Sequence, residues 1–178
     1  QALAQKNRNF GILQIDAHMD CRIQYFGYDY SHASVITHYA NIPEVSAITQ
    51  VGIRDYDASE VNFQKTSKKQ FHVFKDYDCH KRLFEGDTWK MITTEIVDSL
   101  PENVVISLDI DGLSPDLSSA SGTPVPGGMT WNQLIYLFEC ISQHKTVLGV
   151  ELVEVRTESD NHIWPALVGA KIIKLLAN

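Results

Sequence analysis

Five short apolar segments recur along the chain, each with the length of a β-strand. The predicted strands are residues 10–16, 48–53, 71–74, 103–109 and 146–155. Their apolar residues mostly follow one another instead of alternating with polar ones. Such runs are typical of strands that are buried on both faces of a parallel sheet.

The segments between these strands have the polar character or the 3.6-residue apolar spacing of helices. The predicted helices are residues 35–40, 57–69, 89–100, 131–144 and 165–176, together with the tail of a helix at residues 2–8. Thr88 and Thr130 stand where N-caps of the third and fourth helices are expected, and Pro165 opens the last one.

Strands and helices thus alternate, which predicts a three-layer α/β fold with helices on both faces of a mainly parallel sheet. We find no linker or internal repeat and expect residues 1–178 to form a single domain. Ligands in such folds bind beyond the carboxyl ends of the strands. The residues that directly follow the strands are therefore the first candidates for chemistry.

The composition is that of a globular protein, with 44% hydrophobic and 21% charged residues. A formal net charge of -7 without any basic run argues against a nucleic-acid partner. No apolar stretch is long enough to span a bilayer, so no membrane partner is expected. The three cysteines are scattered and form no CxxC pair, which favours reduced thiols and a cytoplasmic location.

Acidic residues follow two of the predicted strands at a spacing of two. Asp16, His18 and Asp20 follow the first strand, and Asp109 and Asp111 end the fourth. Alternate side chains of an extended chain share a face, so each set can converge. Four carboxylates brought together repel one another unless a cation lies among them. The pattern therefore predicts a site for two divalent ions.

Oxygen and imidazole ligands without thiolates suit manganese, magnesium or zinc, and an oxygen-rich set favours manganese. Two ions about 3.5–4 Å apart lower the pKa of a bound water and supply a nucleophile near neutral pH. The alternative interpretation of these acidic residues is that they are helix caps or surface charges.

Three separated blocks resemble one enzyme family. Residues 16–20 (DAHMD) resemble a DAHxD signature, residues 107–128 (SLDIDGLSPDLSSASGTPVPGG) a longer SxDxDxxDPxxxPGTGTPxxGG signature, and residues 149–155 (GVELVEV) a third block. All three are similar to blocks of the ureohydrolases, which include arginase, agmatinase, guanidinobutyrase and formiminoglutamase. The resemblance implies an arginase-like fold and hydrolysis of a guanidino or amidino C–N bond that releases urea and an amine.

The resemblance also implies roles for single residues. The two-manganese centre would be held by Asp16, His18, Asp20, Asp109 and Asp111, with two ions per subunit in the complete protein. A guanidinium is a planar cation that favours a carboxylate with bidentate geometry. The family pattern gives that place to Glu154, with Glu151 as the nearby competitor.

Two further roles follow from the resemblance. His32 lies in residues 30–34 (YSHAS), similar to the agmatinase segment whose histidine is proposed to pass a proton to the leaving amine. His38 is the alternative. Thr123 matches a GTP segment and is expected to support the site or the substrate by hydrogen bonding, or else to be a turn residue.

The chain also departs from the family pattern. A GGDH-type segment that supplies another histidine ligand normally precedes the DAHxD block, and it does not occur in these residues. We therefore expect an N-terminally truncated chain. Ser114 replaces a common aspartate, a change that affects local structure more than chemistry.

Arg22 stands where arginase has an asparagine that selects its amino-acid substrate. An arginine there either binds an acidic substrate, which favours formiminoglutamate, or pairs with a loop acid such as Asp29. The YSHAS segment favours agmatinase. Formiminoglutamase, arginase and a non-catalytic metal-binding subunit of the same fold are the alternatives. A homo-oligomer, a trimer or hexamer, is expected from the family.

Overall fold

A single five-stranded parallel sheet forms the centre of the computed structural model, which describes residues 3–6, 9–119, 121–157 and 163–177. The strand order is β3-β2-β1-β4-β5. The strands are β1 (Phe10–Ile15), β2 (Val45–Ile53), β3 (Gln70–Lys75), β4 (Asn103–Asp109) and β5 (Thr146–Val153). The predicted parallel sheet is thus confirmed.

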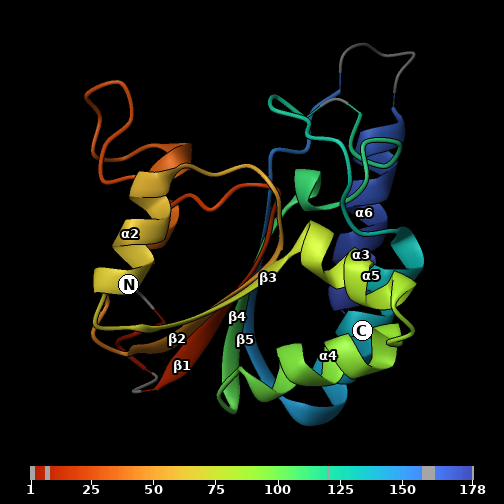
Figure 1. The fold of residues 1–178 in the computed structure, drawn as a ribbon, viewed down its shortest axis with the longest axis horizontal. Helices are drawn as coiled ribbons and strands as arrows, with labels where there is room; N and C mark the ends of the chain where they lie inside the picture. Colours follow the sequence, from red (N-terminus) through yellow and green to blue (C-terminus); the bar gives the residue numbers. More distant parts are fainter. Residues whose placement is uncertain (1–2, 7–8, 120, 158–162, 178) are drawn as a thin grey trace.

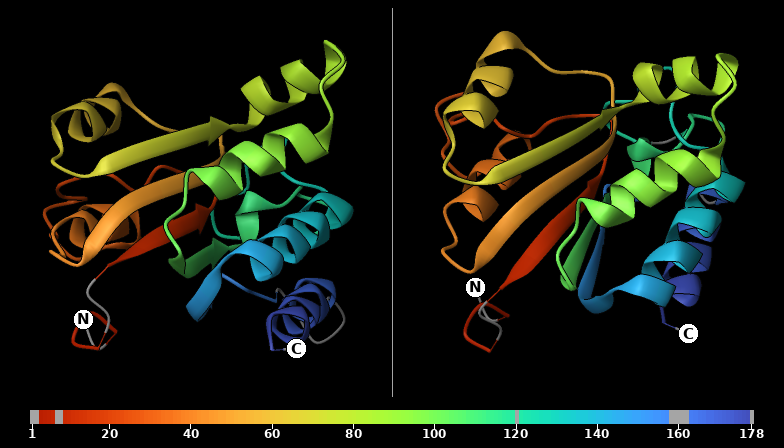
Figure 2. Two further views of the ribbon diagram at one scale, coloured as in Figure 1. Left: turned by 90° about the horizontal axis from the view of Figure 1, so that it is seen from below. Right: turned by 60° about the horizontal axis from the view of Figure 1, so that its bottom comes forward.

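Helices cover both faces of the sheet and complete the three layers. Figure 1 and Figure 2 show α1 and α2 on one face and α3 to α6 on the other. The helices are α1 (Val35–Ala40), α2 (Ala58–Thr66), α3 (Asp76–Phe84), α4 (Trp89–Asp98), α5 (Trp131–His144) and α6 (Trp164–Leu176). Two short 3-10 turns are η1 (His32–Ser34) and η2 (Ile110–Gly112). Within the described ranges, no helix combines the length and the apolar character that crossing a bilayer requires.

Side-chain caps fix where three of the helices begin. Thr88 and Thr130 accept backbone N–H groups of the first turns of α4 and α5, as predicted. Asp57 and Glu60 form a reciprocal capping box at the start of α2. These caps satisfy backbone donors that have no partner inside the helix.

Each face of the sheet has its own apolar core. Leu13 and Ile106 pack under α4, α5 and α6, whereas Ile12 and Ile48 pack under α1 and α2. Neighbouring residues of β1 thus enter opposite cores, as the pleat requires. Burial on both faces is the physical reason why the strands are continuous apolar runs.

Some elements differ from the prediction. The helix α3 was not predicted, because most of its residues are polar and only Cys79 is buried. The strand β2 begins at Val45, three residues earlier than expected. Residues Leu3 to Lys6 form a turn closed by a hydrogen bond from Lys6 N–H to the Leu3 carbonyl (3.1 Å), so the predicted helix is wrong there. Residues 2, 7 and 8 lie outside the described ranges.

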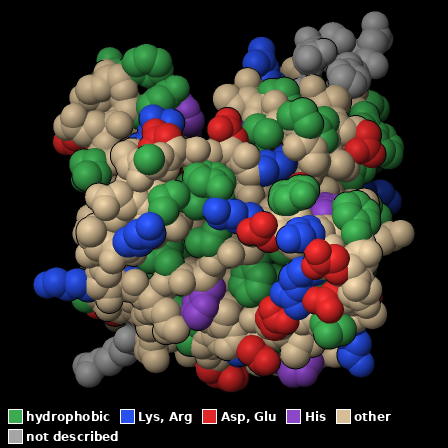
Figure 3. Space-filling model, viewed as in Figure 1, with side chains coloured by type: hydrophobic (Ala, Val, Ile, Leu, Met, Phe, Trp, Pro, Cys, Tyr) green, Lys and Arg blue, Asp and Glu red, His purple; other side chains and the backbone are tan. Residues whose placement is uncertain are grey.

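The order of the strands reverses beside β1. The chain runs from β1 through β2 to β3 on one side, then crosses to β4 and β5 on the other. Such a switch point, at the carboxyl ends of the strands, is where open α/β sheets bind ligands. Both acidic segments follow the two strands that flank it. Figure 3 shows the surface hollowed at the top of the view, over this edge of the sheet.

Candidate metal centre

The segment after β1 is held over the end of the strand. The backbone N–H of Asp16 donates to the Val51 carbonyl (3.1 Å), and that of His18 donates to Oδ1 of Asp16 (2.7 Å). The side-chain amide of Gln14 donates to Oδ2 of the same carboxylate (2.7 Å). Both oxygens of the buried Asp16 carboxylate are therefore fixed in position.

The segment after β4 packs directly against the first. The carboxylate of Asp109 accepts the backbone N–H of Asp111 (2.9 Å), and that of Asp111 accepts the N–H of Ala17 (3.2 Å). A β-carbon at Gly112 would lie only 2.7 Å from the backbone nitrogen of Asp16. Glycine at this position therefore permits the close approach of the two segments.

Arg54 directly follows β2 and contacts both segments, because its backbone N–H donates to the Ala17 carbonyl (2.8 Å) while its side chain reaches the segment after β4. Its guanidinium donates to the carbonyls of Gly52 (3.1 Å), Asp111 (2.6 Å) and Val125 (3.0 Å). Burial lowers the pKa of this guanidinium. Arg54 could not be recognised from the sequence, because a single arginine after a strand has no local pattern that reveals its carbonyl partners.

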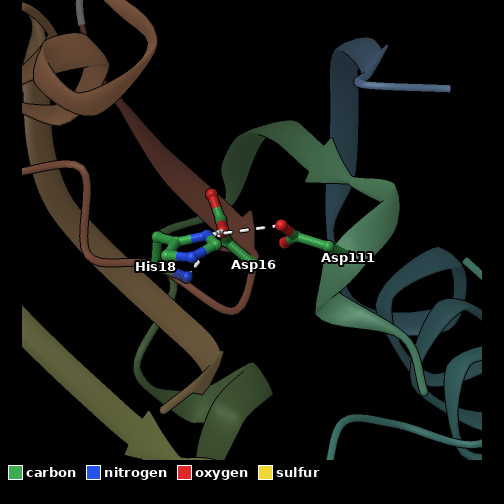
Figure 4. Close-up of side chains that lie close together, drawn as sticks. All are labelled: Asp16, His18 and Asp111. Atoms are coloured by element: carbon green, nitrogen blue, oxygen red, sulfur yellow. Dashed lines mark hydrogen bonds and ion pairs between the residues drawn. The ribbon is translucent and has the colours of Figure 1, made fainter. Parts of the chain in front are cut away.

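Two groups of possible ligand atoms lie where the segments meet. In the first, ligand atoms of Asp16, His18 and Asp111 lie within 4.8 Å of one another, and in the second, those of Asp109, Asp111 and Glu154 do. His18 Nδ1 is 3.3 Å from Oδ2 of Asp111 and 3.5 Å from Oδ1 of Asp16. Figure 4 shows the Asp111 carboxylate and the His18 ring facing one another. Asp111 belongs to both groups.

The electrostatics of these groups favour a bound cation. Burial, together with the charges of Asp16 and Asp111, raises the pKa of Asp109 to about 9. Burial likewise raises the pKa of Asp16 to about 6 and that of Asp20 to about 8. Hydrogen bonds to Asp111 and Asp16 raise the pKa of His18 to about 11. Carboxyls that bind protons this tightly are destabilised as bare anions, so the donor set fits divalent ions.

Manganese is therefore expected to stabilise the complete protein. Binding at 100 times the dissociation constant adds about 2.7 kcal/mol per site to the free energy of unfolding. Thermal melting with Mn²⁺ should show a rise in Tm of several degrees, and a chelator should reverse it. A melting temperature that responds equally to Na⁺ at matched ionic strength would contradict a specific site.

Asp20 and Glu154 reach this region through an unusual backbone. Their φ angles are +53° and +57°, in the left-handed region that these residues rarely adopt. Glu154 follows the end of β5, which explains why the strand stops before the predicted residue 155. Among the described residues, the carboxylate of Asp20 belongs to neither ligand group, although it lines the cavities above them.

Two adjoining cavities lie over the ligand groups. The larger has a volume of about 620 Å³, and the smaller, about 150 Å³, is lined by Glu154 and Thr123. Asp20, His32 and Asp109 line both, so the two cavities meet at these residues. A small molecule can therefore contact the candidate ligands and extend into the larger space.

The two candidate histidines both line the larger cavity. His32 is exposed, and its ring packs against the edge of Tyr25, with 5.3 Å between centroids. His38 stacks on Tyr30 at 4.4 Å, and its Nε2 donates to the Asp29 carbonyl (2.8 Å). His32 also lines the smaller cavity with Glu154, which His38 does not. Of these two cavities, His32 thus borders both, whereas His38 borders only the larger one.

Thr123 contacts a candidate ligand. Its hydroxyl donates to Oδ2 of Asp111 (3.4 Å), and the hydroxyl of Ser121 donates to the same oxygen (3.3 Å). The loop after β4 therefore positions the carboxylate that both ligand groups share.

Arg22 forms ion pairs with two acidic residues of the same chain. Its guanidinium lies 2.9 Å from the Asp57 carboxylate and 4.0 Å from that of Glu60. The suggested partner Asp29 was wrong, because that carboxylate accepts a hydrogen bond from Gln24 (2.6 Å) instead. Sequence alone gives no sign that the capping residue of α2 would take this place.

A row of polar side chains crosses the sheet beneath the carboxylates and was also missed. The polar row consists of Gln50, Gln14, Ser107 and Glu151, which pair in register across β2, β1, β4 and β5. Gln50 donates to the side-chain oxygen of Gln14 (2.5 Å), and Ser107 donates to Glu151 (2.5 Å). The sequence signal for this row is a polar residue inside each of four mostly apolar strands.

Comparisons with known proteins agree with this arrangement. A family model described as "Arginase family" matches residues 1–177. The chain is 33% identical over 162 residues to the N(1)-aminopropylagmatine ureohydrolase of Thermus thermophilus, covering 91% of this chain and 52% of the relative. It is 31% identical over 140 residues to the agmatinase of Pyrococcus horikoshii, covering 79% and 45%. The chain thus spans about half the length of the curated relatives it matches.

Solved structures show the same fold. An agmatine ureohydrolase of Thermoplasma volcanium superposes with a TM-score of 0.76 at 25% identity, covering 94% of this chain and 54% of that one. An arginase of Bacillus caldovelox superposes with a TM-score of 0.80 at 22% identity, covering 98% and 62%. The predicted arginase-like fold is confirmed by these similarities.

Proposed function

Because this chain belongs to the arginase family, we propose that the complete protein is a manganese-dependent ureohydrolase. It hydrolyses a guanidino C–N bond and releases urea and an amine. The observation that supports this most is the pair of ligand groups that share Asp111 at the switch point of the sheet. A carboxylate that belongs to two neighbouring ligand groups would be suited to holding two cations close together.

The chain offers ligands for both ions. Asp16 and His18 would contribute from the segment after β1, and Asp109 and Asp111 from the end of β4 and the turn after it. Asp20 lies outside both ligand groups but lines the cavities above them, and its role as a ligand stays a prediction. Oxygen and imidazole donors without thiolates favour manganese. When bound, the ions would supply Lewis-acid activation of water and of the substrate.

Other residues would act on the substrate. Glu154 faces the smaller cavity close to Asp109, where its carboxylate can orient a guanidinium by paired hydrogen bonds. His32 would give a proton to the departing amine, a role supported by its position in the lining of both cavities. Thr123 would act by holding Asp111 rather than by touching the substrate.

We further propose that the substrate is agmatine or a similar guanidinoalkylamine. Arg22 lines the smaller cavity, but its guanidinium is paired with Asp57, which disfavours a role in holding the carboxylate of an acidic substrate such as formiminoglutamate. The sequence relatives named agmatinase and N(1)-aminopropylagmatine ureohydrolase support the same class. The homo-oligomeric assembly and the cytoplasmic location stay predictions.

The decisive experiment measures urea release by the complete, manganese-loaded protein. Agmatine, N(1)-aminopropylagmatine, arginine and guanidinobutyrate are compared, and formiminoglutamate is assayed for formamide. We expect turnover of the two amines. Turnover of formiminoglutamate alone would keep the metal chemistry and reverse the substrate assignment. Bound manganese without any turnover would favour a non-catalytic subunit.

The Arg22→Gln variant tests the interpretation of the Arg22 pair. Both partners are more than one-third exposed, so the variant should change the free energy of unfolding by less than about 1 kcal/mol. The kcat/KM for agmatine should stay within about threefold, because the guanidinium does not bind substrate. Steady-state kinetics and thermal melting measure the two quantities. A loss of more than about 30-fold at unchanged stability would place Arg22 in the substrate site.

A further inference from the structure

The larger cavity contains a carboxylate that the proposed reaction does not use. Glu151 is the charged member of the polar row, and its Oε1 accepts hydrogen bonds from the hydroxyls of Tyr39 (2.6 Å) and Ser107 (2.5 Å). Tyr39 belongs to α1 and Ser107 to β4, so two separate elements hold the carboxylate. Burial raises the pKa of Tyr39, and the hydrogen bond to Glu151 raises it further.

The charges around this cavity are all of one sign. Among the described residues, no lysine or arginine lines it, whereas Asp16, Asp20, Asp109 and Glu151 do. Asp16 and Asp109 belong to the ligand groups, but Glu151 belongs to neither. A half-buried, oriented carboxylate that faces a cavity without a cationic side chain is suited to an organic cation.

The two carboxylates near the end of β5 face different cavities. Glu151 lines the larger cavity and Glu154 the smaller, so a molecule with two cationic ends contacts both carboxylates only by extending from one cavity into the other. A chain of four methylenes puts roughly 7 Å between a guanidinium carbon and a terminal amine. The two cavities meet at His32 and Asp109, so one molecule can occupy both.

We propose that Glu151, oriented by Tyr39 and Ser107, binds the terminal ammonium of a guanidinoalkylamine whose guanidinium lies beside Glu154. Glu151 is then the residue that selects amines over guanidino acids. This inference rests on the proposed function, since it assigns a specificity residue to the same site.

The test compares two substrates that differ only in the ammonium group. Agmatine and n-butylguanidine share the guanidinobutyl skeleton, and only agmatine carries the terminal charge. In the complete, manganese-loaded protein, Glu151→Gln keeps an oxygen that can accept from Tyr39 and Ser107 but removes the charge. We expect the KM for agmatine to rise about 10- to 100-fold while kcat/KM for n-butylguanidine stays within about twofold. Glu139→Gln, on the exposed face of α5, is the matched control and should change neither.

Each other outcome overturns a defined part of the proposal. Equal losses for both substrates would give Glu151 a structural role, and unchanged agmatine kinetics would place the ammonium elsewhere. Calorimetric binding of the two compounds separates the inference from the proposed function. If the wild-type protein cleaves neither compound, a loss of agmatine affinity in Glu151→Gln still supports the subsite. Equal agmatine affinities of the two proteins would overturn it.

Discussion

Replacing Asp111 with asparagine is expected to lower urea release by the complete protein about 1,000-fold. Asp111 is 1% exposed and belongs to both ligand groups, so removing its charge would weaken both groups. Asparagine keeps the size of the side chain and an oxygen that can accept the Ala17 N–H. The variant therefore removes the charge with little change in shape. Initial rates of urea formation and metal content per chain measure the effect.

Asp116→Asn is the matched control for Asp111→Asn. Asp116 is an exposed residue of the same loop, and it should keep full activity and metal content. Retention of two ions and more than a tenth of the activity in Asp111→Asn would show that Asp111 is not the shared ligand. Circular dichroism of the two metal-free variants distinguishes loss of metal from loss of fold.

Gly112→Ala is expected to lower the free energy of unfolding by about 3 kcal/mol. The new β-carbon would lie 2.7 Å from the Asp16 nitrogen, 2.9 Å from the Ile15 carbonyl carbon and 3.0 Å from the Asp16 α-carbon. All three atoms are backbone at the end of the central strand, so no side-chain rotation relieves the contact. The backbone has to move, and the Asp16 carboxylate has to move with it. Calorimetric unfolding and manganese affinity should both report the change.

Gly122→Ala provides the comparison for this steric effect. A β-carbon at Gly122 would meet only Oε2 of Glu154, at 3.9 Å, which is an ordinary contact. We expect a change in the free energy of unfolding below about 1 kcal/mol. Equal stability of the two alanine variants would show that the segments after β1 and β4 do not depend on close approach at Gly112.

Much of the fold and the candidate centre could be predicted because the signals are local. A buried parallel strand is an apolar run, and acids at a spacing of two after such a strand share a face. The carboxyl ends of parallel strands meet at one edge, which brings Asp16 and Asp111 together although they are far apart in the sequence. The helix α3 lacked a local signal, since its single buried residue, Cys79, defines no apolar face.

The rest depends on contacts between distant segments. Arg54 could be assigned only once its carbonyl partners were placed by the loop after β4. The choice of partner for Arg22 likewise depended on where α2 begins. In the sequence, the residues of the polar row are isolated polar positions in mostly apolar strands, and in β2 a second polar residue, Thr49, stands beside Gln50. Their alignment arises only when four strands are paired.

That alignment has a consequence for how the sheet assembles. Gln14 and Gln50 are almost fully buried and bond to one another on the face under α1 and α2. A one-residue slip of either strand would turn its glutamine into the apolar core on the opposite face, where its amide would lose these partners. A misaligned sheet would therefore contain buried amides without partners and would be less stable. The row beneath the carboxylates thus favours the register in which the acidic residues converge.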